Sequence, residues 1–127
     1  MALYRITLRL SRNPDAGFPD GDDRFGYVMV APLDSDGMLD ASNWSEQWRD
    51  CTVTRFTDDR AERREGRLRH KGERWYFDYD VNDDSDDEPV YKLGDHRLRH
   101  GDYVTIHEAD GDDLTYVVSE QQLLPGQ

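Results

Sequence analysis

The chain has 127 residues but only one cysteine, Cys51, so it cannot form an intramolecular disulfide. Proteins that depend on disulfides belong mostly to oxidising compartments. The sequence also lacks a long apolar run, because Arg5, Arg9 and Arg12 interrupt the hydrophobic residues near the N-terminus. A signal peptide needs an unbroken apolar stretch, and a membrane helix needs about 20 apolar residues. From these two shortages we expect a cytoplasmic protein with no membrane contact.

Positive charge is scarce as well. The chain has 16 lysines and arginines against 28 aspartates and glutamates, which gives a formal net charge of −12. Nucleic-acid binding depends on cationic side chains that neutralise phosphates, so we expect no nucleic-acid partner. Aromatic residues make up 11% of the chain, and this share predicts a folded core rather than disorder. At this length we expect a single domain over residues 1–127.

The common catalytic and ligand-binding motifs are missing too. No serine lies in a Gly-x-Ser-x-Gly frame, no glycine-rich loop suits a phosphate, and no cysteine–histidine pair has the spacing of a zinc site. The acidic run from Asp80 has carboxylates at EF-hand offsets, but Ser85 stands where the loop needs glycine. Tyr91 stands where that loop needs a bidentate glutamate. We expect no metal and no cofactor.

What the sequence does contain is a pattern of short strands. Residues 4–10 alternate between apolar and polar side chains, which is typical of a half-buried strand. Similar β-branched and aromatic runs recur between turn residues, and this spacing predicts seven or eight short antiparallel strands. We therefore expect a mainly β fold, either a small, partly open barrel or a two-sheet sandwich. Residues 13–26 and 80–89 read as acidic loops, and residues 122–127 as a frayed tail.

One short helix is predicted at about residues 40–49. Asp40 or Ser42 is a suitable N-cap, and Trp44 and Trp48 lie four residues apart, on one face of a helix. Two tryptophans on one face either dock on the core or form an exposed interface. We favour the core, and the sequence does not decide between the two.

Charge is distributed unevenly along the chain. Residues 54–76 contain eight basic and five acidic residues, whereas residues 78–95 contain eight acidic residues and a single lysine. This separation gives the surface an electrostatic direction, which favours steered contact with a partner. We therefore expect a basic surface patch from residues 54–76 and an acidic loop from residues 78–95.

A tetrapeptide occurs twice: Arg67–His70 repeats as Arg97–His100. Each copy is soon followed by glycine and then by a β-prone run, so each predicts a strand, a turn and a second strand. An internal duplication and a chance match both remain open. If the two hairpins lie side by side, their exposed side chains form one binding surface. Its expected members are Arg67, Arg69, Arg97, Arg99, Tyr76 and Tyr103.

The favoured function is a non-enzymatic interaction module for a protein partner. The alternative is a small hydrolase-like enzyme in which His70, His100 and Asp102 meet in a pocket at the hairpin turns, since a carboxylate can orient an imidazole for acid–base chemistry. The third hypothesis is a single-stranded RNA-binding module, because arginines and aromatic residues are mixed near residues 67–77. Exposed strand edges also leave room for a homodimer.

Overall fold

The computed structural model describes residues 3–58, 63–71, 74–78, 88–89, 97–107 and 113–124. This part of the chain forms eight strands, one α-helix and two 3-10 turns. The strands are β1 (Leu3–Leu10), β2 (Asp22–Pro32), β3 (Thr52–Phe56), β4 (Arg64–Lys71), β5 (Arg74–Asp78), β6 (Glu88–Pro89), β7 (Tyr103–His107) and β8 (Asp113–Leu123). The helical segments are η1 (Pro14–Ala16), α1 (Ala41–Gln47) and η2 (Trp48–Asp50).

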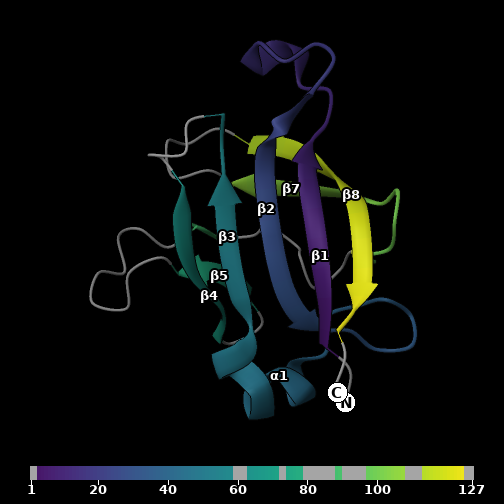
Figure 1. Cartoon of the computed structure of the whole chain (residues 1–127), viewed down its shortest axis with the longest axis vertical. Coiled ribbons are helices and arrows are strands. Elements are labelled where there is room, and N and C mark those ends of the chain that lie inside the picture. The colour runs from purple at the N-terminus through teal and green to yellow at the C-terminus, as the bar shows by residue number, and fades with distance from the viewer. Residues whose placement is uncertain are drawn as a thin grey trace.

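All eight strands belong to one sheet, in the order β6-β5-β4-β3-β2-β1-β8-β7. Every pairing between them is antiparallel. The sheet curls into a half-barrel, with α1 at one end (Figure 1), and the end strands β6 and β7 lie near each other. The predicted mainly β fold and the partly open barrel are confirmed. The sandwich alternative does not apply, because the described strands form one sheet.

Strand β1 shows how the alternating pattern builds the sheet. It lies between β2 and β8, so both of its edges are hydrogen-bonded. Ile6, Leu8 and Leu10 are buried in the barrel, while Arg5 is exposed on the outer surface. Successive side chains of a strand point to opposite faces, so the alternation places the apolar set inside. A register shift against β8 after Thr7 marks a bulge in this pairing.

The short helix forms where the sequence predicts it. The Asp40 carboxylate accepts a hydrogen bond from the Asn43 amide at 3.2 Å, as an N-cap does. The α-helix ends at Gln47 and continues as the 3-10 turn η2 to Asp50. Together they cover the predicted range of about 40–49 to within a residue at each end, which is the usual uncertainty of helix boundaries.

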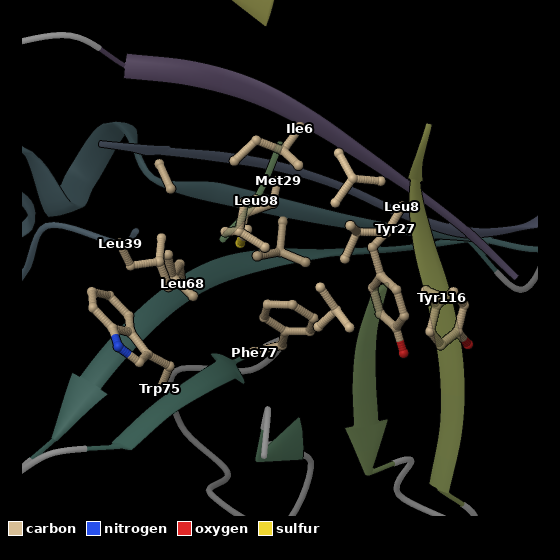
Figure 2. Packing of buried hydrophobic residues seen from close by; sticks show 14 of the residues in the cluster. Ile6, Leu8, Tyr27, Met29, Leu39, Leu68, Trp75, Phe77, Leu98 and Tyr116 are labelled. Carbon is tan, nitrogen blue, oxygen red and sulfur yellow. The ribbon is translucent and has the colours of Figure 1, made fainter. Parts of the chain in front are cut away.

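Two aromatic clusters pack in different parts of the molecule, and Figure 2 shows Tyr27, Phe77 and Tyr116 of the first and Trp75 of the second. In one, the Tyr27 ring lies 5.1 Å from Phe77 and 5.2 Å from Tyr116, measured between centroids. In the other, Trp44 of α1 lies 5.9 Å from Trp75. The Trp44 indole N–H also donates to the Leu68 carbonyl at 2.9 Å. Trp44 therefore packs on the core, as favoured from the sequence, and attaches α1 to β4. The same expectation is wrong for Trp48, which lies outside the buried cluster and contacts two exposed arginines.

Two predicted loop boundaries differ from the structure. The expected acidic loop 13–26 is shorter, because β2 begins at Asp22, which pairs with Leu10 beyond an irregularity in the register. The expected frayed tail 122–127 begins later, since Gln122 and Leu123 still belong to β8. In both cases the neighbouring strand β1 supplies hydrogen-bond partners that local composition does not reveal. The predicted acidic loop 80–89 lies outside the described residues except for the two residues of β6.

Candidate binding face beside strand β4

The first copy of the repeated tetrapeptide lies within β4 and is paired with β5. Arg67 is in register with Asp78, and Arg69 with Tyr76. Leu68 is fully buried, whereas Arg67 is exposed and Arg69 half-buried. Because alternate residues of a strand face opposite sides, the two arginines lie on the outer face of the barrel. The hairpin predicted from the first copy is confirmed by this register.

Trp48 lies beside Arg67, on the 3-10 turn η2. The guanidinium carbon of Arg67 is 5.6 Å from the centroid of the Trp48 ring, and that of Arg49 is 5.3 Å away. Both distances fall within the range of cation–π attraction. Both arginines are exposed, and Trp48 is half-buried. We call these three residues, Trp48, Arg49 and Arg67, the Trp48 face.

Backbone hydrogen bonds hold η2 against β4. The Cys51 amide donates to the Trp48 carbonyl at 3.2 Å, which closes the turn, and the Leu68 amide donates to the Cys51 carbonyl at 2.9 Å. Thr52 is then in register with Arg67. These contacts place Trp48 next to Arg67, although 19 positions separate the two residues in the sequence.

Arg69 is held by a buried acid and is less available than Arg67. Its Nη1 lies 3.4 Å from Oδ2 of Asp78, whose side chain is only 4% exposed. Removing Arg69 would take a positive partner away from a buried carboxylate, which is costly. The salt bridges found among the described residues include neither Arg49 nor Arg67. In the described part of the chain, Arg49 and Arg67 therefore contact the Trp48 ring and take part in no salt bridge.

The second copy of the tetrapeptide adopts a different structure. Residues 97–100 are irregular and not a strand, so the second hairpin expected from the repeat does not form. Leu98 is buried, its amide donates to the Gly37 carbonyl at 2.8 Å, and its carbonyl accepts from the Gln121 side chain at 2.6 Å. Arg99 donates to the Ser35 carbonyl at 3.1 Å.

The expected six-residue binding surface is therefore not built from two neighbouring hairpins. Arg67, Arg69 and Tyr76 come from paired strands β4 and β5. Arg97 and Arg99 instead flank the buried Leu98 in the irregular segment before β7, and both are exposed. Tyr103 is 63% exposed at the start of β7. These residues come from two separate parts of the sheet order.

Two of the three catalytic candidates, His70 and Asp102, have contacts elsewhere. The His70 ring packs 4.3 Å from Trp75 and 5.8 Å from Trp44, between centroids. His100 is exposed in the turn before β7. The Asp102 carboxylate accepts a hydrogen bond from the Arg99 amide at 3.1 Å, a common role of aspartate in turns. No hydrogen bond in the described part of the chain joins any two of these three residues.

Cys51 has the properties of a structural residue. It is buried, and its Sγ lies 3.4 Å from the Gln47 carbonyl oxygen. Burial raises the pKa of the Cys51 thiol to about 12, and the charge of Asp50 adds to this effect. A nucleophilic cysteine needs a lowered pKa, so this thiol stays protonated at neutral pH. Among the described residues, no group of three or more histidines, cysteines, aspartates and glutamates could hold a metal ion.

Sequence reasoning found Arg67 but missed Arg49. The signal was present, because Arg49 follows Trp48 directly and an arginine next to a tryptophan can stack on its ring. The missing information was the pairing of Thr52 with Arg67, which brings the two arginines to one ring. That pairing is a tertiary fact, so composition alone could not supply it.

Comparisons with protein-family models, with curated proteins and with solved structures found no match to this chain. The helices within the described residues are all too short to span a membrane.

Proposed function

We propose that this protein is a cytoplasmic, non-enzymatic binding module that engages a protein partner through the Trp48 face. The observation that supports this proposal is the pair of exposed guanidiniums, Arg49 and Arg67, on one indole ring. Tryptophan and arginine are the residue types most enriched among interface residues that dominate binding energy. A half-buried tryptophan flanked by two arginines that form no salt bridge with any described residue matches that composition.

The electrostatics of the chain also support a binding role. With a net charge of −12, most of its surface repels anionic partners. A local site with two available cations stands out against that background and can discriminate between partners by charge. Charge arrangement of this kind contributes specificity and association rate more than raw affinity.

The enzyme alternative has weaker support. His70 packs between two tryptophans, and Asp102 accepts the Arg99 amide. A general base must lie within hydrogen-bond reach of the group it serves. The contacts of these two residues are ones that stabilise a fold, and they do not orient His100.

The test is a quantitative pull-down from lysate of the source cell, with and without nuclease. The bait is the tagged full chain, compared with the double variant Arg49→Ala/Arg67→Ala. We expect a stoichiometric protein partner that resists nuclease and is lost from the double variant. Arg5→Ala/Arg12→Ala serves as the control, because it removes the same charge from two exposed arginines elsewhere on the surface.

Three results would contradict the proposal. Capture of the partner by the double variant as strongly as by the parent would place the interface elsewhere. Loss of all captured protein on nuclease treatment would favour the RNA-binding hypothesis. No partner at all, together with turnover of a small-molecule ester or phosphate that Asp102→Ala abolishes, would favour the enzyme.

A further inference from the structure

The Trp48 face has the chemistry to recognise one class of ligand. We infer that it binds a segment of the partner protein that is rich in aspartate and glutamate side chains, through their carboxylates. This inference rests on the proposed function and names the ligand of the same face. It concerns Trp48, Arg49 and Arg67 and does not involve the second copy of the tetrapeptide.

The two guanidiniums beside Trp48 keep their N–H donors available to a ligand. An arginine stacked on an aromatic ring uses the face of its guanidinium, while its N–H donors remain in the guanidinium plane. Those donors form a fork that fits the two oxygens of a carboxylate. Because the Trp48 ring holds both Arg49 and Arg67 within 6 Å, less side-chain freedom is lost when a ligand binds.

The acidic residues near the two arginines affect whether a carboxylate or a phosphate is preferred. Asp50 follows Arg49 directly and is exposed, whereas Glu65, two positions before Arg67 on the same strand face, is paired with Arg63 at 3.7 Å. A phosphate monoester carries about −1.5 to −2 charges at neutral pH, whereas a carboxylate carries one. At a single arginine fork, repulsion from the neighbouring Asp50 therefore penalises a phosphate group more than one carboxylate group.

Two other exposed arginines, Arg99 and Arg24, are already bonded to groups of the chain. Arg99 is committed to the Ser35 carbonyl, and its side chain packs against Gly37. Arg24 forms a salt bridge with Asp22 at 2.8 Å. Among the described arginines, Arg49 and Arg67 are the two that share one aromatic ring. This arrangement lets neighbouring carboxylates of one peptide meet two forks at once.

The test is an NMR titration of the nitrogen-15-labelled full chain with an acetylated and amidated tetraglutamate peptide. The experiment is run at about 0.15 M salt, where the screening length of about 8 Å suppresses long-range repulsion by the acidic chain. The reporter is the indole N–H signal of Trp48, assigned with Trp48→Phe. The indole N–H of Trp44 is the internal reference, because it is bonded to the Leu68 carbonyl.

We expect the glutamate peptide to shift the Trp48 signal in a saturable way and to leave the Trp44 signal in place. A tetraglutamine peptide of the same length should cause no shift, because it lacks the charge. Replacing either Arg49 or Arg67 with alanine should weaken binding about tenfold, which is the effect of losing one charge-assisted hydrogen bond. Arg67→Lys should lose nearly as much, because an ammonium group has no planar fork.

The control variant Arg5→Ala/Arg12→Ala should bind the glutamate peptide with unchanged affinity. Equal binding by Arg49→Ala/Arg67→Ala and the parent would overturn the inference, as would the absence of any saturable shift. A phosphoserine peptide that binds more tightly than the glutamate peptide would overturn the choice of carboxylate. If the lysate partner is captured through the Trp48 face but the glutamate peptide does not bind, the proposed function stands and the inference fails.

Discussion

The two copies of Arg-Leu-Arg-His share a sequence but not a backbone. Arg67–His70 is part of β4, paired with β3 and β5. Arg97–His100 is an irregular segment beside β8. The comparison separates what four residues determine by themselves from what their neighbours determine.

The buried leucine is common to both copies. Leu68 and Leu98 are each 0% exposed. In each copy, the leucine amide donates to a backbone carbonyl in the segment between β2 and β3, at Cys51 or at Gly37. The tetrapeptide therefore behaves as an apolar anchor between two long polar side chains, and it can serve a strand or a loop.

The residue after the histidine accounts for part of the difference. His100 is followed at once by Gly101, whose φ is +92°, a conformation that ends a strand. The Asp102 carboxylate then accepts the Arg99 amide and closes the turn. In the first copy Lys71 follows His70 and continues the strand by pairing with Arg74.

The largest effect is expected from shortening the two anchors. Leu68→Ala and Leu98→Ala should each lower the free energy of unfolding by about 2–5 kcal/mol, because each removes buried methyl groups and leaves a cavity. Urea unfolding measures both, with Leu123→Ala as the control at a side chain that is 58% exposed. A loss below about 1 kcal/mol for Leu98→Ala alone would mean that the loop copy does not belong to the core.

The histidines of the two copies, His70 and His100, should contribute differently to the free energy of unfolding. His70→Ala should cost about 1–2 kcal/mol, because the imidazole packs on both Trp44 and Trp75 and each aromatic contact is worth roughly 0.5–1.5 kcal/mol. His100→Ala should change stability by less than about 0.5 kcal/mol, since the side chain is exposed. Thermal unfolding at pH 8 compares the two, and equal losses would contradict the assignment of His70 to the core.

Gly101→Ala tests the turn that separates the copies. We expect a loss of about 1–2 kcal/mol, because a side chain at φ +92° is strained. An added Cβ there meets no atom within 4 Å, so the cost is conformational rather than steric. Gly101→Asn is the matched variant and should cost less, since asparagine tolerates the left-handed region. An asparagine variant less stable than the alanine variant would refute this explanation.

A smaller effect is expected at Asp102. Asp102→Ala removes the acceptor of the Arg99 amide and should cost about 0.5–1.5 kcal/mol, the usual net value of one hydrogen bond. The matched variant Asp102→Asn keeps an acceptor oxygen and should retain most of the stability. Chemical denaturation of both variants decides it, and an asparagine variant as unstable as the alanine variant would show that the charge, and not the bond, is needed.

The smallest effect concerns Cys51, whose carbonyl anchors the first copy. Burial raises the pKa of the folded Cys51 thiol from its ordinary value of 9.0 to about 12, so the unfolded chain loses its thiol proton first. Stability should therefore fall slightly as pH rises above 9 and stay level below it, a trend that Cys51→Ala should lack. The native thiol should also resist a disulfide reagent at pH 8. Rapid labelling of the folded chain would contradict this assignment.

Most of the fold was predictable because it depends on local periodicity. The alternation in β1, the cap at Asp40 and the β4–β5 hairpin follow from nearest neighbours in the sequence. The second copy was predicted wrongly, because whether it becomes a strand depends on Gly37 and Gln121, which lie far away in the chain. The same limit applies to the Trp48 face, where Arg67 was identified but its place beside Arg49 was not.

The pairing of β1 with β8 also determines when the sheet can be completed. These strands come from opposite ends of the described chain and lie side by side, close to the two chain termini (Figure 1). The Arg9 side chain donates a hydrogen bond from Nη1 to Ser119 Oγ at 2.7 Å, although 110 positions separate the two residues. During synthesis β1 emerges first, yet its second neighbour emerges last. One edge of β1 therefore stays open on the ribosome until β8 has been made, which exposes an unpaired β edge to other nascent chains.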